Sequence, residues 1–355
     1  MKRAVRYTRT ALVFVVLMFA FGVMLTLNVN VGSKKVQIPP ARIGKILLMG
    51  HPDNGGYEDA PKEFVDQAKV IWKIRLPRLL AAAVLGGALS LSGYLLQTFF
   101  RNPIAGPYVL GISSGAKLLV GIVMIFIVGS VSGVPFRITM AASFLGAMLV
   151  TGLVLLFARK MRSMSMLLVI GIMISSICTA VTDFIVTFGD DSHIANLHQW
   201  SMGSFSAVKW DDLRLCSIVI FIAAVCTFLI SKPISAYQLG EGYARSMGVN
   251  VKLFRVLLIG LSSVLSACVT ALSGPISFVG VAVPHIAKLL FGSSKPIVII
   301  PGSFLLGAAF CMGCDLIART ILSPTELAIS TVTAVFGAPV VIALMLRRQR
   351  GKTDE

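Results

Sequence analysis

The chain has 355 residues, of which 56% are hydrophobic and only 13% are charged. Soluble globular domains carry about 25% charged residues, so this composition excludes an ordinary soluble protein. The net charge of +17 comes without a soluble basic domain, which argues against a nucleic-acid partner and favours contact with anionic membrane lipid.

Long apolar runs predict an all-α, polytopic membrane protein. Residues 138–158 and 163–182 contain no charged residue, and neither do 11–33 and 327–346. About 20 apolar residues are needed to cross roughly 30 Å of hydrocarbon as a helix. We therefore expect a single transmembrane domain over residues 1–355 with about ten spans. These are predicted near 11–31, 79–99, 108–129, 138–158, 165–187, 213–231, 253–272, 277–292, 298–318 and 327–346.

The first span, 11–31, is too long for the apolar region of a cleaved signal, so we interpret it as an anchor. A polar loop over 34–78 follows it and is expected outside the cell. A modest excess of Lys and Arg on the other side places both termini in the cytoplasm.

The second and third spans form a hairpin between Arg75 and Ala116. Two arginines precede an apolar helix of small residues, an Arg-Asn-Pro loop follows, and a second apolar helix begins at once. Gly111–Gly115 matches the G-x-S-x-G pattern of hydrolases, but that motif requires a strand before it and a histidine partner. We interpret these small residues as helix-packing positions.

Lys117 in the third predicted span and Asp183 in the fifth stand out as charged residues in span interiors. A charge in a span costs several kcal/mol, so such groups are usually paired or line a pathway. Pairing of Lys117 with Asp183 and separate snorkelling of each to an interface both remain open.

A polar segment over 232–252 separates the sixth and seventh spans. Its Leu239–Asn250 portion is amphipathic, is bounded by glycines and suits one or two short surface helices. It is either a solvated loop or a docking element for a cytoplasmic partner. Farther on, 256–287 is too long for one crossing, and Gly274-Pro275 predicts a turn inside it, with a further kink at Pro284.

Arg75, Arg78 and Arg319 are expected at the outer ends of the second and ninth spans. Guanidiniums facing outward suit bidentate capture of carboxylates on a partner. Snorkelling, or a local pair between Asp315 and Arg319, explains them equally well from the residues alone.

Two short motifs do not indicate chemistry. Cys311 and Cys314 have metal or redox spacing, but no histidine or second cysteine pair lies near them, so packing is the simpler interpretation. The terminal Gly351-Lys352-Thr353 lacks the earlier glycine of a phosphate-binding loop. Any ATP-driven work must therefore come from another subunit.

Ordered motifs along the chain resemble the FecCD-type permeases of bacterial ABC importers, which carry iron chelates, haem or cobalamin. The motifs are R-L-P-R at 75–78, S-G-x-x-x-Q at 92–97, R-N-P-I-A-x-P at 101–107, L-G-I-S-S-G-A at 110–116, W-x-x-G-S at 200–204, A-R-S-M-G-V at 244–249, G-P-I-S-F-V-G-x-x-x-P-H-I at 274–286, D-x-x-A-R at 315–319, E-L-A-I at 326–329 and F-G-A-P at 336–339. The commoner family form of the ninth motif is E-L-P-I, so this chain lacks a proline there.

The resemblance implies ten helices per subunit and a dimer around a translocation path. Arg75, Arg78 and Arg319 would dock a substrate-binding protein. The coupling residues toward an ATPase would be Gly240, Glu241, Ala244, Arg245, Ser246, Met247 and Gly248. The path and inner gate would involve Ser113, Ser114, Met164, Ser165, Ser175 and Ser176, although family members often have a small hydroxyl residue where this chain has Met164.

The expected function is that of a non-enzymatic permease in a bacterial cell membrane. The expected partners are a second permease copy or paralogue, two ABC ATPase subunits that bind ATP and magnesium, an extracytoplasmic binding protein and membrane lipid. No cofactor or metal ligand is expected in this chain, and His285 is interpreted as a packed helix residue. The expected cargo is a ferric siderophore, since such members are the most numerous, with haem or cobalamin as alternatives. An ion-coupled secondary transporter and a non-transporting scaffold are the competing interpretations.

Overall fold

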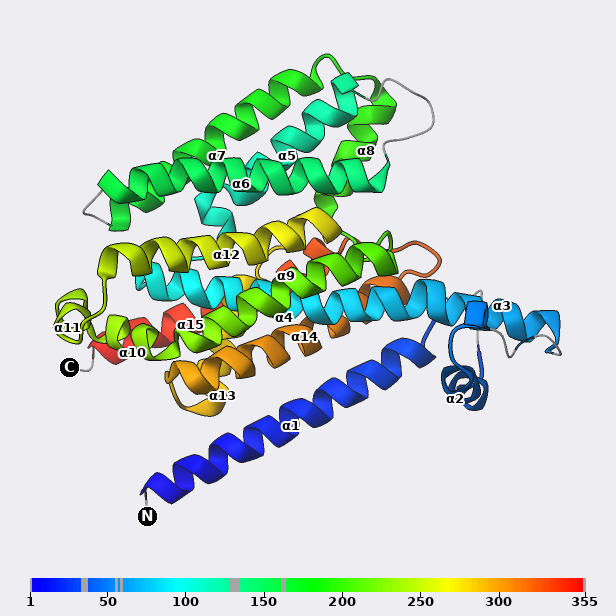
Figure 1. Cartoon of the computed structure of the whole chain (residues 1–355), viewed down its shortest axis with the longest axis horizontal. Helices are drawn as coiled ribbons and strands as arrows, with labels where there is room; N and C mark the ends of the chain where they lie inside the picture. The colour runs from blue at the N-terminus through cyan, green and yellow to red at the C-terminus, as the bar shows by residue number, and fades with distance from the viewer. Residues whose placement is uncertain are drawn as a thin grey trace.

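The computed structural model describes residues 2–32, 38–54, 57, 60–127, 135–160 and 164–353, and every regular element in them is a helix. The long helices are α1 (Lys2–Asn30), α4 (Leu76–Phe100), α6 (Phe136–Lys160), α7 (Met164–Val186), α9 (Trp210–Leu229), α12 (Val251–Ser273), α14 (Pro296–Thr320) and α15 (Ile329–Thr353). The shorter ones are α2 (Pro40–Met49), α3 (Lys62–Val70), α5 (Ile112–Ile122), α8 (Asp191–Met202), α10 (Ser231–Leu239), α11 (Glu241–Ser246) and α13 (Val279–Phe291). They form an elongated bundle whose long helices share one general direction (Figure 1).

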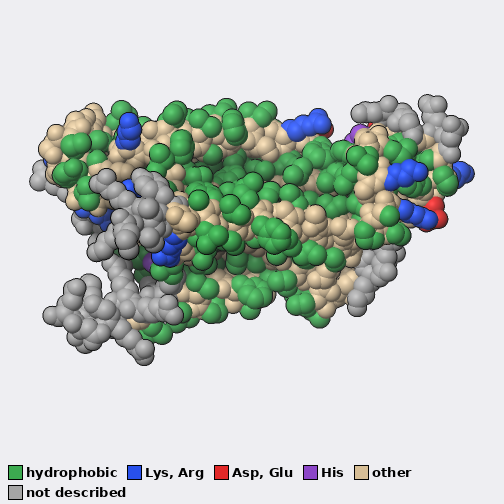
Figure 2. Space-filling view, turned by 90° about the horizontal axis from the view of Figure 1, so that it is seen from below, with side chains coloured by type: hydrophobic (Ala, Val, Ile, Leu, Met, Phe, Trp, Pro, Cys, Tyr) green, Lys and Arg blue, Asp and Glu red, His purple; other side chains and the backbone are tan. Residues whose placement is uncertain are grey.

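The predicted all-α membrane fold is confirmed. Seven helices of the described chain are long and apolar enough to cross a membrane, and three shorter apolar helices accompany them. Each of the ten predicted spans overlaps one of these helices. The surface in Figure 2 is mostly hydrophobic along the bundle, and the Lys and Arg side chains lie toward its two ends.

Helix α4 is the centre of the bundle. In its most apolar stretch 89% of the residues are buried, whereas only 6% are buried in that of α1. It packs against α12, α13 and α14. A Cβ atom added at Gly93 would lie 1.7 Å from the carbonyl oxygen of Gly280 on α13. Only glycine permits this backbone contact, which explains why a helix of small residues occupies the centre.

Serine hydroxyl groups join α4 to α12 inside the bundle. The Ser92 Oγ lies 2.7 Å from the Ser262 Oγ and 2.6 Å from the Ser266 Oγ, and all three side chains are buried. Interhelical hydrogen bonds of this kind replace water, which hydrocarbon does not supply.

The predicted break between the seventh and eighth spans is confirmed. Helix α12 ends at Ser273, where Gly274 has φ of +72°, and α13 begins after Phe278, which is also left-handed. Pro284 lies inside α13.

Several short helices were not predicted. Helices α2 and α3 lie within the 34–78 segment, and a π-helical turn at Ile71–Arg75 joins α3 to α4 without a break. Helix α8 follows α7, and α10 occupies the first part of the predicted polar segment 232–252. They are too short or too polar to give a spanning signal, and α2 is held by burial of Ile43 and Ile46.

The two ends of the bundle carry the polar clusters. The arginine end is defined here as the end at which α4 begins with Leu76 and α14 finishes with Thr320. The α11 end is the opposite one, at which α4 finishes with Phe100 and α12 begins with Val251. Helix α1 begins and α15 finishes at the α11 end, on the left of Figure 1.

Candidate functional site

A buried ion-pair cluster occupies the arginine end. Arg78, in the first turn of α4, faces Asp315, near the end of the adjacent α14. Its Nε donates to both carboxylate oxygens of Asp315, at 3.0 and 3.1 Å, and its Nη2 donates to Oδ1 at 2.9 Å. The Arg78 Nη1 also donates to Glu326 Oε1 at 2.8 Å. This fork-to-carboxylate geometry is the strongest arrangement for an arginine pair.

The other two arginines bind the end of α1. Arg319 Nη2 donates to the backbone oxygen and the side-chain Oδ1 of Asn28, at 2.9 and 2.7 Å. Arg75 Nη1 donates to the Val29 carbonyl oxygen at 2.7 Å. Arg319 Nε lies 3.7 Å from Asp315 Oδ2, so the local i,i+4 pair considered from the sequence is present.

The arginine end therefore differs from the expected outward-facing collar. The structure brings Arg75, Arg78 and Arg319 together, but they are only 5%, 9% and 8% exposed. Their partners come from α1, α14 and the loop before α15, and no local spacing predicts which carboxylate reaches Arg78. The exposed member is Glu326, whose side chain is 44% exposed. Sequence reasoning missed Asn28, although a polar residue late in the first apolar run was a visible signal.

A second, more open network lies at the α11 end. Arg255 of α12 forms an ion pair with Glu241, the first residue of α11. The Tyr237 hydroxyl donates to the same Glu241 oxygen at 3.1 Å. Arg101 donates to the Tyr237 carbonyl oxygen at 3.1 Å and stacks over its ring. The loop after α4 is thus connected through α10 and α11 to the N-terminal part of α12.

Electrostatics favour the charged form of Glu241. Burial alone would raise the pKa of this carboxyl, but hydrogen bonds from Arg255 and Tyr237, with the charges of Arg255 and Arg101, lower it below its ordinary value. Burial and the Glu241 charge raise the pKa of Tyr237, so its hydroxyl stays protonated and remains a donor.

Most of the predicted coupling residues form an exposed face at this end. Ala244 is fully buried and anchors α11, while Tyr243 and Met247 are 48% and 63% exposed. Arg245 and Ser246 are exposed as well. Gly240 and Gly248 bound the helix with φ of +136° and +81°, values that side-chain-bearing residues rarely adopt. The glycines noted in the sequence therefore turn the chain into and out of α11.

The predicted path residues divide between two environments. The Ser114 and Ser175 hydroxyls lie 2.6 Å apart where α5 meets α7, and Ser113 is half-buried. Ser176 is exposed and donates to the Ile172 carbonyl oxygen one turn earlier on α7. Met164 and Ser165 belong to α7, but their side chains lie outside the described residues.

Helix α7 carries an open apolar face around Ser176. Met173, Ile177 and Phe184 are 53%, 64% and 66% exposed. The neighbouring α8 exposes Asn196 and His198, which sequence reasoning did not single out. This face of α7 is not covered by the rest of the described chain, so lipid or another subunit lies against it.

Lys117 and Asp183 form no ion pair within the described residues, so the pairing hypothesis is wrong. The contact between the Ser114 and Ser175 hydroxyls shows that these two positions of α5 and α7 lie at the same depth in the bundle. Lys117 lies three residues beyond that level and Asp183 eight residues beyond it, a depth difference of about 7 Å. Asp183 is exposed near the end of α7, as the snorkelling alternative requires.

The described part of the chain contains no group of three or more His, Cys, Asp or Glu side chains placed to hold a metal ion. Cys311 and Cys314 are buried free thiols in α14. His285 is half-buried in α13, and its packing role stays a prediction.

Comparison with known proteins identifies the family. The model of the FecCD transport family matches residues 15–347. The chain belongs to this family. It is accordingly a multi-pass transport permease and not an enzyme, which confirms the resemblance noted in the sequence.

Curated relatives cover most of this FecCD family member. It is 40% identical over 283 residues to the vitamin B12 import system permease protein BtuC of Klebsiella pneumoniae, covering 79% of this chain and 84% of the relative. It is 33% identical over 285 residues to the hemin transport system permease protein HmuU of Yersinia pestis, covering 80% and 85%. BtuC of Vibrio cholerae is 37% identical over 282 residues, covering 79% and 84%.

A solved structure shows the same fold. It is described as a metal-chelate type ABC transporter in an inward-facing conformation, and it superposes with a TM-score of 0.79 at 27% identity. The match covers 95% of this chain and 99% of the other.

Proposed function

We propose that this chain is the permease subunit of an ABC importer that takes up a bulky metal chelate. The observation that carries the proposal is the family match over 15–347 together with the open apolar face of α7 beside the polar α8. In the bilayer such a face is covered by lipid or by another subunit, and we assign it to a second subunit because of the family match. A second permease copy against α7 supplies the missing wall of a path.

Energy input is proposed to enter at the α11 end. Leu239, Tyr243 and Met247 are 71%, 48% and 63% exposed, which gives α11 an apolar contact surface for the ATPase subunit. The Glu241–Arg255 pair and Tyr237 connect that surface to α12. A displacement of α11 would therefore be passed to a membrane helix and, through Arg101, to the loop after α4. ATP and magnesium are bound by the partner ATPase.

The arginine end is proposed as the docking end for the binding protein, with both chain termini in the cytoplasm. Exposed Glu326 is one of two carboxylates on Arg78, and the other, Asp315, is 2% exposed. An acidic side chain of the binding protein could replace Glu326 on Arg78 without opening the buried pair. Arg75 and Arg319 would then act by holding α1 and α14 in place.

The cargo class is a metal chelate large enough to need a smooth path and not a tight site. A ferric siderophore is the sequence-based proposal. The 40% identity to a permease named for vitamin B12 import supports cobalamin as the second candidate.

The test is uptake into vesicles that contain the permease, its ATPase and its binding protein. We expect ATP-dependent accumulation of one labelled chelate among ferric siderophore, haemin and cobalamin. Vesicles that contain the permease alone are the matched control and should accumulate none. Uphill transport by the permease alone would contradict the proposal.

A further inference from the structure

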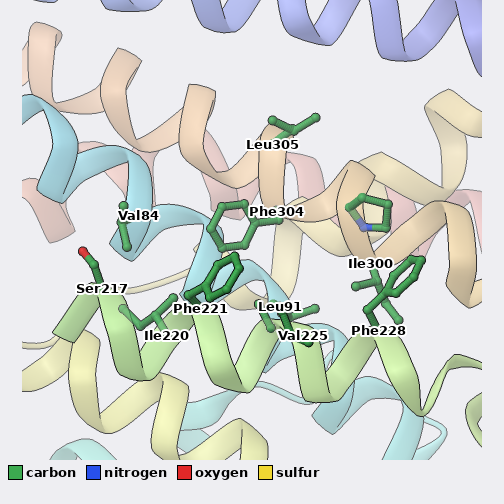
Figure 3. Close-up of a pocket in the computed structure, with 12 residues that line it drawn as sticks. Val84, Leu91, Ser217, Ile220, Phe221, Val225, Phe228, Ile300, Phe304 and Leu305 are labelled. Carbon is green, nitrogen blue, oxygen red and sulfur yellow. The ribbon is translucent and has the colours of Figure 1, made fainter. Parts of the chain in front are cut away.

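An apolar groove lies on the side of the bundle, between α9 and α14, with α4 behind it. Its volume is about 530 Å³, and among the described residues that line it Ser217 alone has a polar side chain. Figure 3 shows Phe221 and Phe228 of α9 facing Phe304 and Ile300 of α14 across this space. The pocket falls within the range of about 300–1,000 Å³ that is typical of small-ligand sites.

The groove opens toward the surrounding membrane. Phe221, Val225 and Phe228 line it and are 69%, 41% and 42% exposed. None of the lining residues belongs to α1 or to the α7 face on which a second copy is expected. Membrane lipids can therefore enter the groove directly from the bilayer.

The length of the groove matches one leaflet. From Ser217 to Phe228 the chain advances eleven residues along α9, which is about 16 Å at 1.5 Å per residue. Half of a hydrocarbon core of roughly 30 Å is about 15 Å. In Figure 3 Ser217 and Val84 lie at one end, and Phe228 and Ile300 lie at the other, toward the α11 end. The groove thus extends from the middle of the membrane to one surface.

Two lysines stand where the groove reaches that surface. Lys232 follows Phe228 by about one helical turn, and Lys295 immediately precedes α14, five residues before Ile300. Both side chains are exposed, and neither forms an ion pair within the described residues. Helices α10 and α14 are in contact, which brings the two segments together. The positive end of the α14 dipole adds to their charge.

We propose that the groove and the two lysines form a binding site for one anionic glycerophospholipid. An acyl chain occupies the groove between α9 and α14, and the phosphate lies between Lys232 and Lys295. The acyl chain fills this poorly packed space and contacts its apolar lining. The two lysines favour a negatively charged headgroup over a neutral one. The site requires no assumption about cargo or partners, because its recognition depends only on these membrane-facing residues.

The headgroup is tested by native mass spectrometry of the full-length permease with added phosphatidylglycerol or phosphatidylcholine. We expect the wild-type chain to retain one phosphatidylglycerol per copy in preference to phosphatidylcholine. Each lysine should raise the affinity for phosphatidylglycerol about five-fold. The double variant Lys232→Gln with Lys295→Gln should therefore lower the preference for phosphatidylglycerol over phosphatidylcholine about 25-fold. Lys209→Gln, which removes an exposed charge from the other end of α9, is the matched control and should change nothing. An unchanged preference in the double variant would overturn the headgroup assignment.

The acyl-chain position is tested separately with Ala224→Phe, which fills the groove. It should release both lipids, because the space for the chain is lost, whereas the lysine variant should lose only the preference for the anionic lipid. Leu215→Phe is the control, since Leu215 is 58% exposed on the same helix but does not line the groove. Full lipid retention in Ala224→Phe would overturn the groove assignment. The lysine variant alters only exposed side chains, so its result stands even where Ala224→Phe fails to insert.

Discussion

The two ends of the bundle differ in how deeply their charged groups are buried. At the arginine end, the Arg78–Asp315 pair has side chains only 10% and 2% exposed, and every guanidinium is bound to another segment. At the α11 end, the Arg255–Glu241 pair is 19% and 26% exposed and neighbours an open helix face. The first cluster fixes α1, α4, α14 and the loop before α15 together, whereas the second connects a short helix to a long one and remains accessible to a partner.

This contrast implies different energetic roles. A buried pair is costly to disrupt because the remaining charge cannot be hydrated, whereas a partly exposed pair loses less when broken. The arginine end should therefore control stability, and the α11 end should control the coupling of movement to a partner.

The largest expected effect comes from breaking the buried cluster. Asp315→Ala leaves Arg78 without its principal partner and should lower the free energy of unfolding by about 3–5 kcal/mol. Thermal unfolding of the purified chain in detergent measures this change. Glu326→Ala is the matched control and should cost under about 1 kcal/mol, because its side chain is 44% exposed. Equal losses of unfolding free energy in the two variants would show that burial does not determine how much each carboxylate contributes to stability.

The next effect concerns transport and not stability. Glu241→Gln should cost about 1 kcal/mol of folding stability but greatly reduce substrate uptake, because α11 is no longer held to α12 through Arg255. Uptake and ATP hydrolysis measured in the same vesicles should separate, with hydrolysis retained. Arg245→Gln changes an exposed charge on the same helix and is the control for folding. Uptake equal to wild type in Glu241→Gln would remove the coupling role.

The same pair predicts a pH dependence. The folded-state pKa of Glu241 lies below its ordinary value of 4.5, so its stabilisation is present above pH 4.5 and is lost as the pH falls through the folded-state value. The stability difference between wild type and Glu241→Gln should thus be seen near neutral pH and disappear in acid. Unfolding temperatures of both proteins across this interval test it. A difference that persists unchanged in acid would contradict the ion-pair interpretation.

The smallest expected effect is an absence of coupling between Lys117 and Asp183. Because the two residues lie about 7 Å apart in depth, Lys117→Met and Asp183→Asn should change stability additively, within about 0.5 kcal/mol. A double-mutant cycle by thermal unfolding measures this. A larger interaction energy would restore the pairing that the structure contradicts.

Much of the fold was predictable because the bilayer requires a simple local pattern. Uncharged runs of sufficient length predicted the ten apolar helices, and Gly274-Pro275 predicted the break between α12 and α13. The glycines flanking α11 were visible as turn residues for the same reason, since they act within their own turn. The short helices α2, α3 and α8 were missed because none is long and apolar enough to produce a spanning signal.

The candidate site was only partly predictable. The three arginines could be identified individually, but their burial depends on Asn28 and Asp315, which lie at the ends of other helices. Pairing of Lys117 with Asp183 was reasonable from charge alone and failed because depth along two packed helices decides contact.

Hydrophobic run length and ordered motifs are local properties of the chain, and they suffice to establish that this protein crosses the membrane many times and belongs among permeases. Helix packing, in contrast, settles which guanidiniums are buried, which face of α7 is open and where a groove between α9 and α14 meets two lysines. Those features arise from residues far apart in the chain, and they exist only after packing around α4 has fixed the depth and rotation of each helix.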